Sequence, residues 1–224
     1  MRKWGIIITL FYALIVLGLL VPVYVFLAAD DRLFSPIFYN NVIHGYEYWG
    51  VWLFLAVVLS GQAILLFLSV DTSFKRRKPR AHVAISYIAA SILFSLLTFA
   101  AIFSLGIAVY GGNFGGKHAD STPQVLGFCA FLWLAWGILF YLYFRKSTNI
   151  TTRLVSWLLK GSVLELLIAI PSHVIVRRRG ECTAPAVTSF GIVSGIAVML
   201  LCFGPSVLLL YKKRMDAYGA RSSK

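Results

Sequence analysis

Charged residues are scarce in this sequence, and that scarcity excludes most soluble folds. Only 13% of the 224 residues are Asp, Glu, Lys or Arg, whereas 59% are hydrophobic. A soluble domain usually has about 25% charged residues, so this chain lacks the side chains needed to cover a water-facing surface. The apolar residues also form long runs rather than the stripes of a half-buried helix. We therefore predict an all-α integral membrane protein with a single transmembrane domain over residues 1–224.

Several kinds of functional motif are also missing. The three cysteines form no C-x-x-C pair, so the common zinc and thioredoxin-like spacings are excluded. The sequence contains neither G-x-S-x-G nor H-E-x-x-H. The four histidines are predicted at different depths, which argues against a haem or metal site. We expect no metal and no cofactor, and the sequence gives little reason to expect an enzyme.

Six apolar segments are long enough to cross a hydrocarbon core of roughly 30 Å, which takes about 20 helical residues. The predicted spans are Gly5 to Leu27, Trp49 to Val70, Val83 to Val109, Val125 to Phe144, Leu154 to Val176 and Val187 to Tyr211. The first span follows basic residues as a signal peptide would, but its apolar run is longer than a typical signal core. An uncleaved anchor is favoured over cleavage near Ala28 or Ala29.

The basic residues predict the orientation of the bundle, because short loops rich in Lys and Arg stay on the cytoplasmic side. With the N-terminus inside, 15 of the 21 basic residues fall in cytoplasmic segments and five fall outside. We therefore expect both termini in the cytoplasm and the protein in the plasma (inner) membrane. The basic inner face would attract anionic inner-leaflet lipid. Short basic clusters between apolar runs are typical of membrane topology, so we expect no nucleic acid as a partner.

The longest predicted connection is the first outer loop, Ala28 to Tyr48, which is rich in Phe and Tyr. Aromatic side chains with a polar atom favour the headgroup layer. We expect part of this loop to lie along the outer membrane interface.

The fifth predicted span is the least ordinary, because Glu165 lies near its middle. A charged residue there costs about 2.5 to 3.5 kcal/mol on insertion scales. We therefore expect Glu165 to have a polar partner, to be protonated or to have a functional role. One face of this helix carries a stripe of small and polar side chains: Ser162, Glu165, Ala169, Ser172 and, at its edge, His173. We expect this polar stripe to point into the bundle.

Polar residues on two other spans are candidate partners of the stripe. Gln62 lies near mid-depth in the second span, and the third span carries hydroxyl side chains at helical spacing: Tyr87, Ser91, Ser95 and Thr98. Groups that converge on Glu165 would satisfy a protonated carboxylic acid. The functional interpretation is a protonatable or solute-binding site at mid-membrane depth. The structural interpretation is a neutral Glu165 that holds helices together.

Two further features concern the outer arginines and a pair of glycines. Arg177, Arg178 and Arg179 run against the positive-inside trend. They would suit an anion site at the outer mouth, although pairing with outer acidic residues or lipid headgroups is favoured. In the sixth span, Gly191 and Gly195 form a GxxxG pair that permits close helix contact within the chain or between chains.

Three functions stay open at this point. The first is a small carrier or channel-like protein with a protonatable site at Glu165. The second is a non-catalytic membrane subunit, whose polar stripe and glycine pair mediate assembly into a homo- or hetero-oligomer. The third is a membrane enzyme that acts on lipid, which only the outer arginines support.

Overall fold

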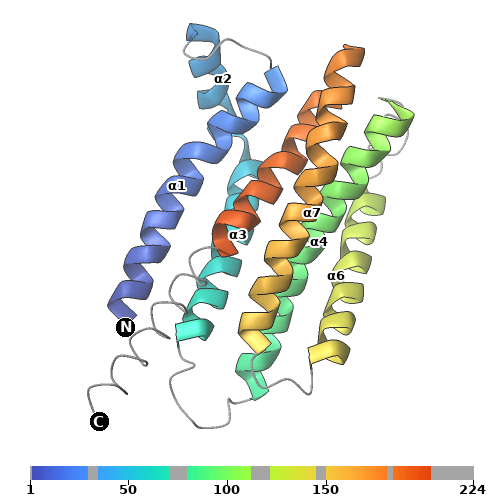
Figure 1. Ribbon diagram of the computed structural model, residues 1–224. Coiled ribbons are helices and arrows are strands. Elements are labelled where there is room, and N and C mark those ends of the chain that lie inside the picture. The colour runs from blue at the N-terminus through green and yellow to red at the C-terminus, as the bar shows by residue number, and fades with distance from the viewer. Residues whose placement is uncertain are drawn as a thin grey trace, which may run out of the picture.

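The computed structural model describes residues 2–29, 35–70, 80–111, 122–144, 150–180 and 184–202, and these form an all-helical bundle (Figure 1). The helices are α1 (Arg2–Ala29), α2 (Pro36–Glu47), α3 (Trp49–Val70), α4 (Arg80–Tyr110), α6 (Thr122–Phe144) and α7 (Ile150–Arg179). A further helix covers Ala184–Cys202. The described residues include no β-strand. The predicted all-α fold is confirmed.

Several of these helices are long and apolar enough to cross a membrane. Five qualify on their own: Thr9–Ala28, Ala84–Tyr110, Pro123–Phe144, Arg153–Arg179 and Ala184–Cys202. Helix α2 and the first part of α3, Trp49–Leu65, make a sixth if they form one bent span. Their length and composition indicate an integral membrane protein. The end of the last predicted span, 203–211, lies outside the described residues.

The helix Ala184–Cys202 is the central helix of the bundle, with α1 and α3 on one side and α4 and α7 on the other (Figure 1). Buried residues make up 67% of it, against 11% to 44% in the other four spans that qualify on their own. The Tyr12 hydroxyl of α1 donates a hydrogen bond to the Ala197 carbonyl. On the α3 side, Phe190 packs edge-on against Phe54, with ring centroids 5.4 Å apart. The central helix therefore contacts both α1 and α3.

The remaining spans are arranged around α4. Helix α4 packs against α3, α6 and α7. Its contact with α6 is aromatic, because Phe94 lies 4.3 Å from Trp136 and 5.4 Å from Phe140 between ring centroids. Helix α6 is the least buried candidate span. It lies at the edge of the bundle (Figure 1), where a membrane helix meets lipid.

The first outer connection contains helix α2, which was not predicted from the sequence. The helix begins after Ser35, whose hydroxyl accepts a hydrogen bond from the Phe38 N–H, and Pro36 occupies its first turn. A polar cap followed by proline is a recognised helix start, so a signal for α2 was present in the sequence. The many aromatic residues of this segment favoured an interfacial loop over a helix in the sequence analysis.

Helix α2 packs back along α1. A Cβ atom at Gly45 would lie 3.0 Å from Val21, and the Tyr46 hydroxyl donates to the Leu17 carbonyl. Both α1 residues belong to the candidate span Thr9–Ala28. The segment is thus a helix with one face packed on α1, and its place at the outer membrane interface stays a prediction.

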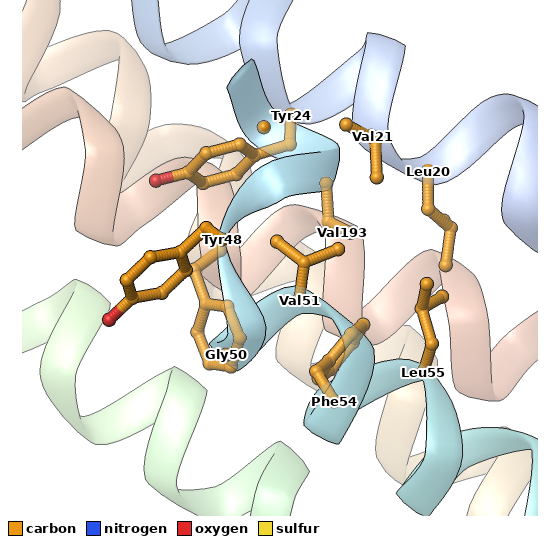
Figure 2. A pocket seen from close by; sticks show the side chains of 11 residues that line it. Leu20, Val21, Tyr24, Tyr48, Gly50, Val51, Phe54, Leu55 and Val193 are labelled. Atoms are coloured by element: carbon orange, nitrogen blue, oxygen red, sulfur yellow. The ribbon is translucent and has the colours of Figure 1, made fainter. Parts of the chain in front are cut away.

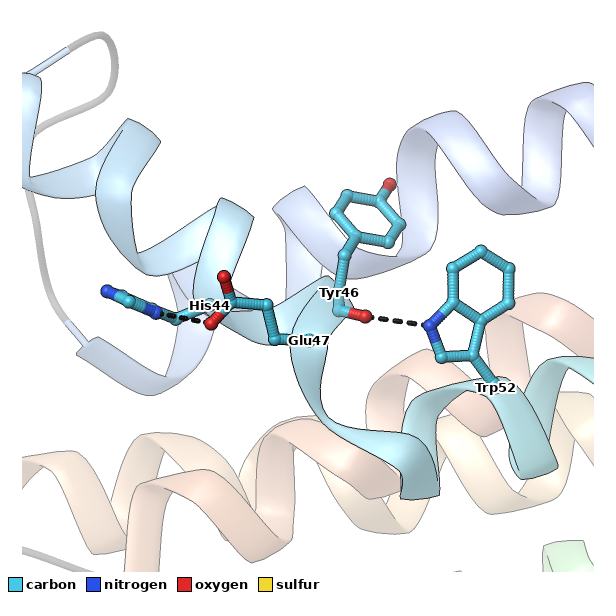
Figure 3. A network of polar contacts seen from close by, with 4 residues as sticks. All are labelled: His44, Tyr46, Glu47 and Trp52. Carbon is cyan, nitrogen blue, oxygen red and sulfur yellow. Dashed lines mark hydrogen bonds and ion pairs between the residues drawn. The ribbon is translucent and has the colours of Figure 1, made fainter.

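Helices α2 and α3 meet at a bend of 70°. The residue between them, Tyr48, has an extended backbone with φ −76° and ψ 116°. A helix end leaves carbonyl groups without partners in the helix. Trp52 of α3 satisfies one of them, because its indole N–H donates to the Tyr46 carbonyl at 2.7 Å (Figure 3). His44 Nδ1 lies 2.8 Å from a Glu47 carboxylate oxygen in the last turn of α2, and both side chains are exposed.

Replacing Tyr12 with Phe should weaken the contact between α1 and the central helix. The variant loses the hydrogen bond to the Ala197 carbonyl, and such bonds between membrane helices average about 0.6 kcal/mol and reach about 1.7 kcal/mol. We expect a lower midpoint of thermal unfolding in detergent. Tyr39→Phe, at an exposed site on α2, is the matched control and should keep the original midpoint. Equal midpoints for the two variants would contradict the contact.

Candidate functional site

The polar stripe of α7 is buried along its whole length. Its five side chains each expose 7% or less of their surface: Ser162, Glu165, Ala169, Ser172 and His173. Glu165 lies near the middle of the candidate span Arg153–Arg179. Lys160, which is about 140° around the helix from Glu165 at about 100° per residue, is exposed. Helix α7 thus turns its small and polar face into the bundle.

The stripe faces the central helix in an antiparallel contact. At one end, His173 Nδ1 lies 2.8 Å from the Thr188 hydroxyl oxygen, and both side chains are buried. Two turns further along this contact, Glu165 lies against Gly191 and Gly195. These residues are three or four positions apart on the central helix, the spacing that keeps side chains on one face.

Gly191 and Gly195 together form a glycine seat for the Glu165 carboxyl group. A Cβ atom at Gly195 would lie 1.9 Å from Oε2, and one at Gly191 would lie 3.3 Å from Oε1. Real Cβ contacts essentially never fall below 3.0 Å, so a side chain at Gly195 would overlap the carboxyl group. The GxxxG pair therefore makes its close contact within the chain.

The Glu165 carboxyl group has no hydrogen-bond partner for either oxygen among the described residues. Ser104 of α4 borders the same space, because a Cβ atom at Gly191 would lie 2.5 Å from its hydroxyl oxygen. That hydroxyl is also buried without a partner in the described part of the chain. Ser104 was not predicted from the sequence. It is six residues from Thr98, about 120° around the helix at about 100° per residue, so it lies outside the predicted row of hydroxyls.

The predicted row of hydroxyls on α4 does not bond to Glu165, and this expectation is corrected. Ser91 and Ser95 each donate to a carbonyl one turn earlier in α4. Thr98 does the same and also accepts a hydrogen bond from the Trp136 indole at 3.0 Å. Ser and Thr in apolar surroundings commonly satisfy their hydroxyls in this way.

The other predicted partners also lie apart from the carboxyl group. The Tyr87 ring packs against Tyr141 of α6, with centroids 6.3 Å apart, and no described residue accepts a bond from its hydroxyl. Ser162 and Ser172 donate to carbonyls of their own helix. The Gln62 side chain lies outside the described part of the chain. The structure thus places a glycine seat and Ser104 around Glu165 instead of a ring of hydroxyls.

The three arginines at the end of α7 have different environments. Arg177 donates from Nη2 to the Leu27 carbonyl in the last turn of α1, at 2.9 Å. A cation suits this position, because the carbonyls at a helix C-terminus lack partners and carry the negative end of the helix dipole. Arg178 and Arg179 are exposed. Arg177 therefore joins α7 to α1, a role that was not predicted, while its two neighbours stay candidates for anion or headgroup contact.

No protein-family model, curated protein or solved structure matches this chain. Within the described residues, no group of three or more His, Cys, Asp or Glu side chains could hold a metal ion. The buried carboxyl group and its surroundings are therefore the basis for the function proposed below.

Adding a methyl group at Gly195 should separate α7 from the central helix. Overfilling a packed contact usually costs about 1 to 3 kcal/mol, so Gly195→Ala should lower the unfolding midpoint in detergent. Gly127→Ala on α6 is the matched control, because a Cβ atom there meets nothing within 4 Å. The control should unfold no earlier than the original protein, since Ala favours a helix over Gly by about 1 kcal/mol.

The double variant Gly195→Ala with Glu165→Ala tests which group the methyl meets. Removing the carboxyl group should recover part of the lost stability. The recovery should be incomplete, because the same Cβ atom would also approach Leu166 within 2.8 Å. A double variant no more stable than Gly195→Ala alone would refute the glycine seat.

Replacing Arg177 with Gln should weaken the contact between α7 and α1. A cation at a helix C-terminus contributes about 0.3 to 1 kcal/mol, and about 2 kcal/mol when partly buried. Arg178→Gln removes the same charge from the exposed neighbouring position. We expect a lower unfolding midpoint for the first variant and not for the second. A loss shared equally by both would assign the effect to general charge rather than to the bond with Leu27.

Proposed function

We propose that this chain is a small membrane carrier or channel-like protein in which Glu165 is a protonation site. The supporting observation is the Glu165 carboxyl group, which is 2% exposed and near the middle of a candidate span. It also lacks hydrogen-bond partners among the described residues. An ionised carboxylate is very costly in such a place, so we expect a proton on it in this arrangement. Ionisable residues inside membrane helices are typically functional.

The structural alternative, in which Glu165 holds helices together, has less support. Polar residues join membrane helices through hydrogen bonds across the contact. Glu165 makes no such bond to the described residues. A carboxyl group that is buried without a bond adds a cost to the fold, and a small apolar residue at the same place would avoid that cost. A role in proton binding would account for its presence.

Release of the proton would change the contact between α7 and the central helix. A charged carboxylate needs several hydrogen bonds or water, and Gly191 and Gly195 have no side chains to provide them. The Ser104 hydroxyl nearby has a single proton to donate. Ionisation would therefore favour a small separation of the two helices, with entry of water beside Ser104. Such a separation is the step that would couple protonation to an opening of the bundle.

We also propose that the chain crosses the membrane six times and has both termini in the cytoplasm. The membrane would be the plasma membrane. The bent pair α2 and α3 would supply the sixth span. The distribution of basic residues supports this orientation, and anionic inner-leaflet lipids would contact the basic face.

The two other functions lose part of their basis. The subunit alternative relied on the GxxxG pair as an assembly surface, but Gly195 lies against Glu165 and Leu166 of the same chain. The lipid enzyme relied on the outer arginines, and Arg177 bonds to the α1 backbone. Oligomerisation through another surface, such as the exposed face of α6, stays compatible with the proposed carrier.

Replacing Glu165 with Gln should remove the response of the protein to pH. The amide has nearly the same shape but binds no proton near neutral pH, so the two states of the site become one. We propose two readouts in vesicles: tryptophan fluorescence of the protein as pH is varied, and collapse of an imposed pH gradient followed with an enclosed dye. Both responses should be present in the original protein and absent from Glu165→Gln.

Glu47→Gln is the matched control, because Glu47 is an exposed carboxyl group on α2. It should keep both responses. A pH response that survives in Glu165→Gln would remove the protonation site from the proposal. Loss of the response in both variants would point to a general effect of negative charge.

A further inference from the structure

A cavity of about 370 Å³ lies between α1, the bend of α2 and α3, and the central helix (Figure 2). Its apolar walls come from three helices: Leu20, Val21, Val51, Phe54, Leu55 and Val193. It is separate from the carboxyl site, because Val193 is two residues from both Gly191 and Gly195. That spacing turns it about 200° away on the central helix, at about 100° per residue.

The bend between α2 and α3 produces this cavity. Helix α2 lies against α1, with Gly45 against Val21. Helix α3 leaves α2 at a bend of 70°, also packs on α1, and places Phe54 against Phe190 of the central helix. The bend leaves a wedge of space between these contacts. Gly45 and Gly50 line the wedge without filling it. The lack of side chains at these two positions therefore helps to set the size of the cavity.

Water is a poor occupant for this space. A buried water needs two to four polar partners, and the side chains that line the cavity offer polar atoms only at Tyr24 and Tyr48. An empty cavity of this size is also unfavourable, because protein interiors pack as densely as organic crystals. The medium around a membrane helix is hydrocarbon, which matches the apolar walls. Lipid is thus the occupant that the surroundings supply.

The size and the rim of the cavity point to a single chain with a polar end. At about 30 Å³ for a water molecule, and a methylene group of similar size, the cavity has room for about a dozen methylene groups. The phenol oxygens of Tyr24 and Tyr48 project to the same side (Figure 2). Phenol hydroxyls can donate hydrogen bonds to ester or phosphate oxygens, and tyrosine favours the level of lipid headgroups. Tyr48 is 61% exposed, so the rim is accessible from outside.

We propose that this cavity binds one acyl chain of a membrane phospholipid, with Tyr24 and Tyr48 at the ester end of the chain. The site does not depend on Glu165 or on transport. It makes the broken span a lipid-binding element, in which a bound chain fills the wedge between α1 and α3.

Photo-crosslinking in vesicles tests this proposal directly. The full chain is reconstituted in phosphatidylcholine that contains a small fraction of phosphatidylcholine with a diazirine in one acyl chain. After illumination, adducts are mapped by mass spectrometry of peptides. We expect adducts to concentrate on the cavity residues Val51, Phe54 and Val193, above the level on exposed residues of α6 such as Leu134. Excess unlabelled phosphatidylcholine in the vesicles should reduce the cavity adducts.

Two variants separate the cavity from ordinary contact with the bilayer. Val51→Phe fills the cavity from α3 and should abolish adducts on Val193. Leu53→Phe enlarges a side chain that is 58% exposed on the same helix, and it should leave those adducts unchanged. Adducts on Val193 that persist in a folded Val51→Phe would overturn the site. In the original protein, adducts spread evenly over α6 and the cavity would overturn it without any variant. Neither outcome bears on the pH response assigned to Glu165.

Discussion

The fold depends on one close contact, in which the Glu165 carboxyl group occupies the space that side chains at Gly191 and Gly195 would fill. This contact brings α7 against the central helix over several turns, from His173 and Thr188 at one end to the carboxyl group further along. The central helix is in turn bonded to α1 through Tyr12. The helix that meets the carboxyl group therefore also contacts α1 and α3.

The sequence predicted the helices and the face that α7 buries because both follow from one-dimensional properties. A run of apolar residues long enough to cross hydrocarbon has few structures open to it other than a helix, since its backbone must bond internally. The stripe that contains Glu165 has helical periodicity, and a helix in lipid turns its polar face inward. Neither inference requires knowledge of which helix lies beside which. The broad architecture of the chain was accessible for that reason.

The surroundings of Glu165 could not be predicted, because they depend on distances between helices. The row of Ser and Thr on α4 suggested a polar partner, but such hydroxyls satisfy themselves on the backbone of their own helix. Ser104 gave no signal, since it is one serine among several in the span. The glycine pair was visible, and its contact within the chain was one of two possibilities. Its role as the seat of a carboxyl group needed the three-dimensional register of α7 against the central helix.

The bend after α2 was missed for a different reason. Ser35 and Pro36 are a standard helix start, yet the segment between them and Glu47 is short and aromatic, which also suits an interfacial loop. The structure shows a helix there that packs on α1. Helix α2 then acquires a polar break at Tyr48 inside an otherwise apolar region, and Trp52 and its hydrogen bond make that break tolerable. Membrane proteins permit irregular backbone where protein or a cavity surrounds it.

The position of the central helix also has a consequence for biogenesis. A chain is made from its N-terminus, so α1, α3, α4 and α7 emerge before the helix that lies between them. Until that helix is made, the glycine contact of Glu165 is absent. The most buried of the candidate spans is therefore made after the helices against which it packs. Closure of the bundle is therefore a late event in the synthesis of the chain.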